Sequence, residues 1–243
     1  MRLAIISDIH GNLAALDAVL RELESERLDQ VVCLGDVAAT GPQPREVIAR
    51  LRSLGCAVVM GNADAYLLDP QPAVDADEDA RKVEAIDRWC AAQLSAADWE
   101  YLRTFQPTIA VPLGGDKQLL CFHGSPRSYN DVISATTSEA ELAPMFDGYM
   151  ATVMVGGHWH FQMLRRYGEG ILLNPGSIGL AYDKQADGGA HIPARAEYAL
   201  LTAANNEVRS IELRRVPYDR EATVRAMFER GMPYAAWWAG DWR

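Results

Sequence analysis

Five short apolar runs in this chain each lead into a residue type that binds metal ions, and this pattern constrains the fold more than any other feature. The runs cover residues 3–7, 30–34, 56–60, 118–122 and 152–155. They lead into Asp8-Ile9-His10, Gly35-Asp36, Gly61-Asn62, His123-Gly124 and Gly157-His158-Trp159-His160. Ligand sites of open α/β sheets lie beyond the carboxyl ends of the strands. The sequence therefore predicts that these polar side chains gather on one rim of a sheet.

The positions of the histidines support this interpretation. The chain has five, and His10, His123, His158 and His160 all follow predicted strands, whereas His191 does not. One histidine after a strand is usually structural, but four at equivalent positions are hard to explain by packing. Imidazole and carboxylate ligands together favour Mn, Fe, Zn or Ni over Ca or Mg.

The order of elements predicts an α/β fold. Residues 1–60 alternate strands with two helices, the second opened by Pro44 and closed by Gly55, so the strands should be parallel with right-handed crossovers. We expect a single domain over 1–243, with a helical insertion at about 69–107 and a C-terminal helical segment at about 217–243. Within these parts, the patterns predict helices over 78–93, 96–105 and 219–230 and hairpin turns at 114–116 and 205–206.

Composition narrows the classes of partner. The net charge of −10 and the lack of a basic stripe argue against stable nucleic-acid binding, although bound divalent metals can reverse the local field for phosphate. No apolar run reaches the roughly 20 residues that span a bilayer, and the N-terminus lacks a signal-peptide pattern. We therefore expect a cytoplasmic protein without membrane contacts.

Taken together and in order, these blocks resemble the signature of the calcineurin-like metallophosphoesterases. Asn174-Pro175-Gly176-Ser177 is similar to a stretch typical of their small bacterial and archaeal phosphodiesterase branch. The resemblance implies a four-layer α/β/β/α sandwich of two mixed sheets, with a dimetal site at the carboxyl ends of the strands. It implies two divalent ions, Mn²⁺ being favoured over Fe, Zn or Ni, and hydrolysis by a metal-bound hydroxide. The implied ligands are Asp8, His10, Asp36 and His160 for one metal and Asp36, Asn62, His123 and His158 for the other, with Asp36 bridging.

One position departs from the pattern of the family. Many members carry His after the Asn of the third block, where this chain has Ala63 followed by Asp64. That His is thought to protonate the leaving oxygen, and general acid catalysis contributes about 10²–10⁴-fold. The departure favours activated diesters or phosphoanhydrides over phosphoserine-type monoesters. Asp36, Asn62 and Asp64 remain the catalytic candidates.

Several other residues allow two interpretations each. Asn12 is a candidate phosphate ligand or the N-cap of the following helix. Arg127 is a candidate phosphate clamp or an ordinary surface arginine. Trp159 could stack on an aromatic group, although packing is favoured, and Ser177 should support a loop near the metals. Trp237, Trp238 and Trp242 form a C-terminal cluster that would suit a homo-oligomer contact, with packing on the domain again favoured.

The favoured hypothesis is a phosphodiesterase that acts on a small phosphorylated substrate. The alternatives are a hydrolase of dinucleoside polyphosphates, a phosphomonoesterase such as a protein phosphatase, and a non-catalytic scaffold like the retromer subunit that resembles this family. The intact set of seven ligand residues argues against the scaffold.

Overall fold

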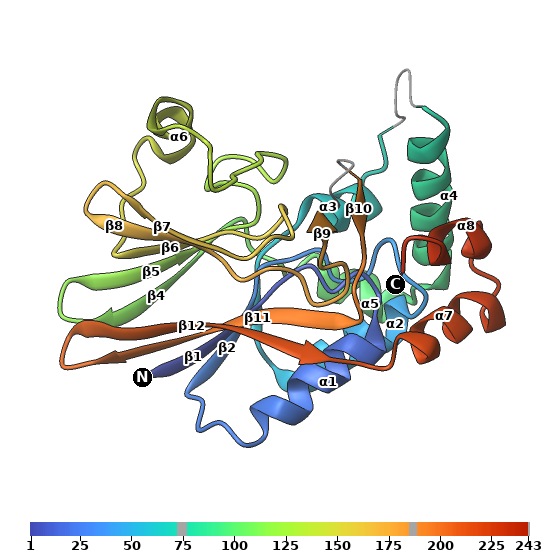
Figure 1. The fold of residues 1–243 in the computed structure, drawn as a ribbon, viewed down its shortest axis with the longest axis horizontal. Coiled ribbons are helices and arrows are strands. Elements are labelled where there is room, and N and C mark those ends of the chain that lie inside the picture. Colours follow the sequence, from blue (N-terminus) through green and yellow to red (C-terminus); the bar gives the residue numbers. More distant parts are fainter. Residues whose placement is uncertain (72–76, 185–188, 243) are drawn as a thin grey trace.

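Two five-stranded mixed sheets face each other at the centre of the molecule (Figure 1). The computed structural model describes residues 1–71, 77–184 and 189–242. The first sheet has the order β12-β11-β1-β2-β3, with strands Glu207–Pro217, Arg195–Ala204, Arg2–Ile6, Gln30–Cys33 and Ala57–Val58. The second has the order β4-β5-β6-β8-β7, with strands Ile109–Gly114, Lys117–Cys121, Val153–Val155, Gly170–Asn174 and Met163–Tyr167. A separate two-stranded ribbon pairs β9 (Asp183–Lys184) with β10 (Ala190–His191).

Helices cover the outer faces of both sheets. Helices α1 (Leu13–Leu23) and α2 (Pro44–Leu54) pack on the first sheet, and α6 (Glu139–Phe146) packs on the second. Strand β1 is buried on both faces: Leu3 and Ile5 join the core between the sheets, while Ala4 and Ile6 join the core beneath α1 and α2. The expected four-layer sandwich of two mixed sheets is confirmed.

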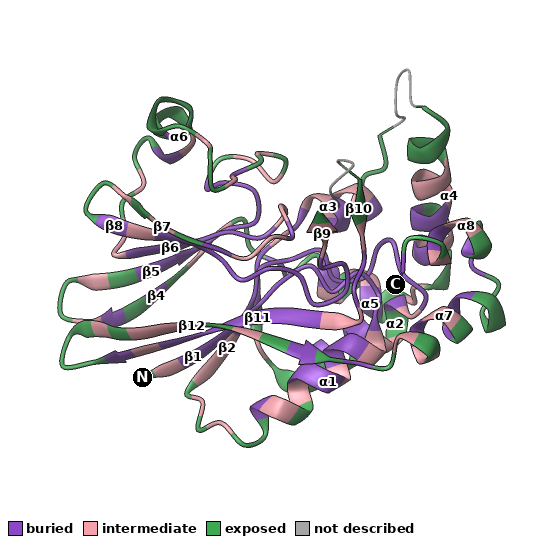
Figure 2. Cartoon of the chain, viewed as in Figure 1, coloured by how far each residue is buried: buried purple, intermediate pink, exposed green. Residues whose placement is uncertain are grey.

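The direction of the strands places their ends together. Strand β1 is parallel to β2 and β2 to β3, and in the second sheet β5, β6 and β8 are parallel. Their carboxyl ends therefore open on one edge of the sandwich, where the polar residues follow. Figure 2 shows that the segments leaving these strands are mostly buried.

Helices α4 (Glu78–Gln93) and α5 (Ala96–Leu102) lie in the segment where the sequence predicts a helical insertion, near this edge, as does α3 (Asn62–Leu68). The C-terminal helices α7 (Arg220–Glu229) and α8 (Ala235–Ala239) follow β12, and the Nζ atom of Lys82 in α4 lies 4.8 Å from the centre of the Trp237 ring in α8. Trp238 and Trp242 are buried, so the C-terminal tryptophan cluster packs on the molecule. In the described ranges no helix combines the length and the apolar character that crossing a bilayer requires.

Many expected elements are present. Pro44 begins α2 and Gly55 ends it with φ of 66°, the left-handed conformation that glycine adopts most easily. Both hairpin turns are confirmed, and Asn205 and Asn206 have φ of 54° and 62°, as a two-residue type I′ turn requires.

Other boundaries differ from the expectation. The second insertion helix ends at Leu102 instead of 105, because the chain turns there to form an isolated bridge between Gln106 and Val59. The third strand spans only Ala57–Val58 instead of residues 56–60. Residues 72–76, near the start of the helical insertion expected at about 69–107, lie outside the described residues.

Candidate metal centre

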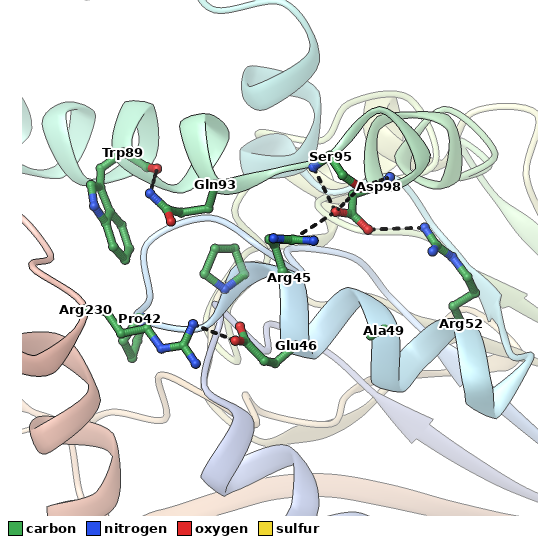
Figure 3. Close-up of a pocket in the computed structure, with 11 residues that line it drawn as sticks. Pro42, Arg45, Glu46, Ala49, Arg52, Trp89, Gln93, Ser95, Asp98 and Arg230 are labelled. Carbon is green, nitrogen blue, oxygen red and sulfur yellow. Dashed lines mark hydrogen bonds and ion pairs between the residues drawn. The ribbon is translucent and has the colours of Figure 1, made fainter.

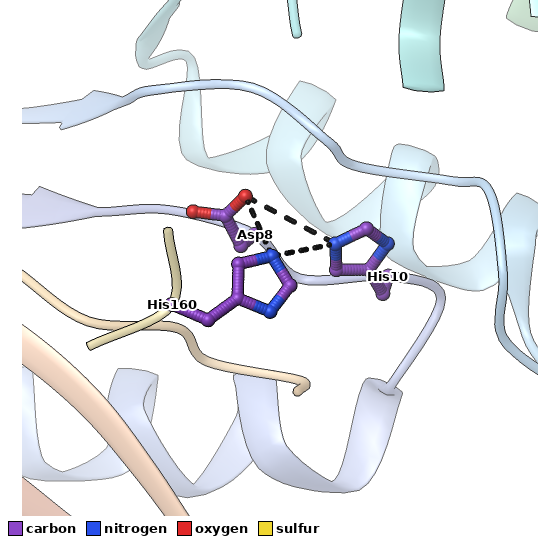
Figure 4. A group of neighbouring side chains, drawn as sticks. All are labelled: Asp8, His10 and His160. Atoms are coloured by element: carbon purple, nitrogen blue, oxygen red, sulfur yellow. Dashed lines mark hydrogen bonds and ion pairs between the residues drawn. The ribbon is translucent and has the colours of Figure 1, made fainter. Parts of the chain in front are cut away.

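Two groups of three metal-binding side chains meet at the carboxyl ends of the strands. Asp8, His10 and His160 form one group, and Figure 4 shows these side chains pointing toward one another from two segments, Asp8 and His10 on the first and His160 on the second. Asp36, His123 and His158 form the other, and the ligand atoms of each group lie within 4.8 Å of one another.

Asp36 belongs to the second group and also faces the first. Its Oδ2 is 3.7 Å from Nε2 of His10 and 3.3 Å from Nε2 of His123. Its Oδ1 accepts a hydrogen bond from the backbone N–H of Ala63 at 2.9 Å. One carboxylate therefore faces both groups and is held by the first turn of α3.

Backbone carbonyls orient three of the imidazole rings. Nδ1 of His10, His123 and His160 lies 3.2, 2.8 and 2.8 Å from the carbonyl oxygens of Ala39, Leu34 and Leu180. A proton on Nδ1 satisfies each carbonyl and leaves a lone pair on Nε2, the tautomer that metal-binding histidines use.

The free atoms of the site are then mostly hydrogen-bond acceptors. Nε2 of His10 and Nε2 of His160 are 3.2 Å apart, and His160 Nε2 is 3.1 Å from Asp8 Oδ1. Buried acceptors in such close contact repel one another unless a proton or a cation lies between them. The donor set fits two divalent cations of the kind that accept imidazole and carboxylate ligands.

Asn62 directs one end of its side-chain amide into the same cluster. The inward amide atom lies 2.9 Å from His123 Nε2, 2.9 Å from His158 Nδ1 and 3.2 Å from Asp36 Oδ2. An amide at this position can donate from its nitrogen to these acceptors or, after rotation by 180°, present its oxygen to a metal ion.

The charge on the histidines depends on their carboxylate neighbours. Burial lowers the pKa of His10 to about 4, although Asp36 opposes the effect. For His123, burial also favours the neutral ring, but Asp36 and Asp8 outweigh it and raise the pKa to about 10. A metal ion would replace this proton, so binding should release protons.

The turns that carry the ligands have an unusual backbone. Asp8, His10, Asp36, His158 and His160 all have positive φ, between 47° and 65°. Neighbouring glycines allow close contacts: a Cβ at Gly61 would lie 2.1 Å from Asp36 Oδ1. A Cβ at Gly41 would lie 1.7 Å from the carbonyl oxygen of His10.

Asp64 and Ser177 support the site from beneath. The carboxylate of Asp64 is fully buried and accepts hydrogen bonds from the backbone N–H groups of Asp36, Val37 and Gly61 at 2.7, 2.9 and 3.2 Å. Ser177 Oγ donates to the carbonyl of Asp8 at 2.7 Å. The structure therefore gives Asp64 a positioning role, and Ser177 lies in the loop-supporting place that the sequence predicted.

A cavity of about 630 Å³ lies over the two groups. Trp159, Phe161, Tyr182 and Trp238 line it beside the ligands, together with Tyr66 of α3. The rings of Trp159 and Phe161 are 5.4 Å apart, and Nζ of Lys184 lies 5.9 and 5.3 Å from their centres. The opening is much larger than one phosphoryl group and has an aromatic wall.

The two candidate substrate ligands have other contacts. Asn12 is buried as the N-cap of α1, where it accepts from Ala15 N and Thr223 Oγ1 and donates to the carbonyl of Gly179. Arg127 is half-exposed outside the cavity and donates to Asp147. His191 lies apart on β10, with its Nε2 3.8 Å from Asp183.

A second cavity, of about 430 Å³, opens between α2, α4 and α5 (Figure 3). Its arginines already have acidic partners: Arg45 and Arg52 pair with Asp98, and Arg230 pairs with Glu46. It contains none of the ligand-type residues of the strand ends, so the first cavity is the candidate site.

A known protein family matches most of this chain. The family is the calcineurin-like phosphoesterase superfamily domain, and the match covers residues 1–197. The chain belongs to this superfamily. It is a metallophosphoesterase, in a family of hydrolases that cleave phosphoester bonds.

Individual relatives agree with this assignment. A metallophosphoesterase from Sphaerobacter thermophilus superposes with a TM-score of 0.74 and is 26% identical, over 99% of this chain and 98% of that one. An uncharacterized protein of Methanocaldococcus jannaschii is 24% identical over 98% of this chain and 96% of its own. A symmetrical bis(5'-nucleosyl)-tetraphosphatase of Pectobacterium carotovorum is 39% identical over 67 residues, which is 26% of this chain and 24% of that enzyme.

Sequence reasoning did not find the residues that wall the cavity. Tyr66, Asp87, Tyr182 and Thr40 line it without belonging to any block that follows a strand. One signal was available for Asp87. Asp87 lies on the same face of its helix as Val83 and Cys90, at spacings of four and three residues. This spacing places a carboxyl group on an otherwise apolar helix face, which is an unusual position for a charged residue.

Proposed function

We propose that this chain is a metal-dependent phosphodiesterase that hydrolyses a small phosphorylated substrate with two divalent ions, Mn²⁺ being favoured. The observation that carries the proposal is the convergence of seven side chains of metal-binding types at the carboxyl ends of the strands. Asp8, His10 and His160 would hold one ion, and Asn62, His123 and His158 would hold the other. Asp36 would bridge both.

When bound, such a pair of ions supplies Lewis acidity to the phosphoryl oxygens and lowers the pKa of water. The chain itself orients the ligands. Backbone carbonyls hold the histidine rings in place, and the N–H of Ala63 fixes Asp36 between the two groups. The aromatic wall excludes water from one side of the reacting group.

The shape of the cavity favours a diester over a monoester. A phosphomonoester presents one organic group, whereas the space of about 630 Å³ is larger than one phosphoryl group and offers the aromatic wall of Trp159, Phe161 and Tyr182 to further organic groups. Aromatic side chains of this kind suit flat aryl or base groups.

A phosphoanhydride substrate is the second candidate. It is supported by the local similarity to a symmetrical bis(5'-nucleosyl)-tetraphosphatase over 67 residues. A phosphate leaving group needs little protonation because its second pKa is about 6. This fits a chain with Ala63 where many relatives carry His.

A substrate panel with the Mn²⁺-loaded protein tests the proposal. We expect a bis-aryl phosphate to be turned over fastest, a dinucleoside polyphosphate to follow, and a phosphoserine peptide to be slowest. Fastest turnover of the peptide would refute the diester preference.

The Asp36→Asn variant tests the metal assignment. Removing the bridging charge should weaken both ions and reduce turnover by at least about 10³-fold while the fold is kept. Metal content, turnover and circular dichroism are measured together. Asp116→Asn, in the exposed turn between β4 and β5, is the matched control and should behave as the parent chain. An active Asp36→Asn protein with two bound ions would disprove the bridging role.

A further inference from the structure

A buried carboxyl group faces the catalytic cavity without belonging to the metal ligands. Asp87, in the middle of α4, lines the same cavity as Ala63 and is 8% exposed. Its Oδ1 accepts a hydrogen bond from Thr40 Oγ1 at 2.8 Å. In the ranges 1–71, 77–184 and 189–242, no Lys, Arg or His side chain lies within ion-pair distance of it.

The surroundings of Asp87 favour its protonated form. Burial raises its pKa to about 7, and the negative charges of Asp36 from the end of β2 and Glu84 from its own helix act in the same direction, while the Thr40 contacts oppose them. The thiol of Cys90, one turn later, is buried and neutral, because burial raises its pKa to about 12. Bound cations would lower the pKa of Asp87, and an anionic phosphoryl group beside them would raise it.

Other groups around the cavity are poorly suited to give up a proton. Burial raises the pKa of Tyr182 to about 12 and also raises that of Tyr66. Asp64 is fully buried, and its two oxygens accept three backbone hydrogen bonds. A group with a pKa near the working pH is the most effective general acid.

We propose that Asp87 is the proton donor to the leaving oxygen and supplies the function that Ala63 cannot. The assignment rests on the proposed phosphodiesterase reaction. As the bond from phosphorus to the leaving oxygen breaks, that oxygen keeps the electron pair and takes the proton of Asp87, so it departs as an alcohol. The oxygen of a water molecule forms the new bond to phosphorus, releases one of its two protons to solvent and keeps the other. The resulting Asp87 carboxylate then takes a proton from solvent.

This assignment widens the range of substrates. The presence of Ala63 alone predicted a restriction to leaving groups that need little protonation. With Asp87 as the donor, diesters with alkoxide leaving groups, such as those of sugar or glycerol hydroxyls, also become substrates.

A leaving-group series tests the proposal with the Mn²⁺-loaded enzyme. The substrates are phosphodiesters that share one ester group and differ in the other, from p-nitrophenol to a simple alcohol. Asp87→Asn keeps an acceptor for Thr40 but cannot donate an acidic proton. We expect it to lower kcat/KM for the alkyl ester by about 10²–10⁴-fold and for the p-nitrophenyl ester by less than about 3-fold. The alkaline limb of the pH profile should also disappear for the alkyl ester only.

Two further variants keep the test decisive. Asp87→Ala is measured beside the Asn variant in case one of them does not fold, which thermal unfolding will reveal. Asp79→Asn, an exposed change of the same kind in the first turn of α4, is the matched control and should leave all rates unchanged. Equal losses for every leaving group, or no loss for the alkyl ester, would overturn the assignment.

A readout that does not depend on turnover separates this proposal from the proposed function. Infrared difference spectra of the holoenzyme should show a protonated carboxyl band in the parent chain that titrates near neutral pH and is absent from Asp87→Asn. A carboxylate that stays ionised from about pH 5 upward would exclude the donor role even if the enzyme is an active phosphodiesterase. If the parent chain instead cleaves no diester at all, the proposed function itself fails.

Discussion

Asp64 should be important for metal binding although it is not one of the proposed ligands. Its two oxygens accept hydrogen bonds from three backbone N–H groups, two of which belong to Asp36 and Val37 at the end of β2. These bonds hold the turn that presents Asp36 to both groups of ligands. Replacing Asp64 should therefore loosen both candidate metal sites at once.

The size of the effect follows from the number of bonds. Hydrogen bonds to a charged group contribute about 1.5–3 kcal/mol each, and a buried donor left unpaired costs about 1–3 kcal/mol. Asp64→Ala leaves three buried N–H groups without an acceptor, so we expect a loss of at least about 4 kcal/mol of the free energy of unfolding. Asp64→Asn keeps one acceptor oxygen but turns an amide N–H₂ against a backbone N–H, which should cost about 2–3 kcal/mol.

Urea unfolding of the metal-free proteins near pH 8 measures the loss. Burial raises the pKa of Asp64 to about 7, so above that pH the carboxylate is ionised and its bonds are at full strength. Titration calorimetry with Mn²⁺ should show affinities that are about 10–100-fold weaker, as for other groups that orient metal ligands. If both variants unfold within about 1 kcal/mol of the parent chain, or bind Mn²⁺ equally well, the support that we assign to Asp64 is wrong.

Three further predictions concern other parts of the site. His191→Ala should leave turnover within about 2-fold of the parent value, because its ring lies on β10 outside both groups; a dead enzyme would disprove the separation. Trp159→Ala should raise KM for an aryl diester by about 3–10-fold, as expected for a lost aromatic contact, and an unchanged KM would remove Trp159 from the substrate wall. The metal-free protein should lose stability relative to Asp87→Asn as the pH rises from about 4 to about 7, because the folded state keeps a proton on Asp87 that the unfolded state has released. The difference should approach about 4 kcal/mol at about 1.4 kcal/mol per pH unit, and parallel stability curves would contradict the raised pKa.

Features that are local in sequence could be predicted. Strands β1 and β2 are short continuous apolar runs. Pro44 and Gly55 mark the two ends of α2, and the Asn205-Asn206 pair marks the turn between β11 and β12, by backbone chemistry alone. The ligand-type residues could be recognised because each directly follows such a run, so one rule about strand ends brings them together.

Features that depend on packing between distant segments could not be predicted. The first turn of α3 begins at Asn62, and nothing before it distinguishes a helix start from a loop, because Gly61 offers no capping side chain. The cavity wall is formed by α3, α4, the loop around Tyr182 and α8. The arrangement of these elements in space cannot be predicted from the periodicity of apolar residues in the sequence. Helix α6 carries one local signal, since Ser138 and Glu141 form a capping box. Its sequence is otherwise too short and too weakly patterned to predict a helix.

The left-handed backbone at five of the seven proposed ligands has a consequence for how this protein could change over evolutionary time. Each such residue is held in a conformation that costs an L-amino acid about 1–2 kcal/mol and costs glycine almost nothing. At His158, which is only partly buried, a glycine would relax the chain and still leave the backbone N–H that donates to Asp8. Losing a metal ligand at such a position would then raise the stability of the fold, so a descendant freed from catalysis would keep this fold while losing its metal site.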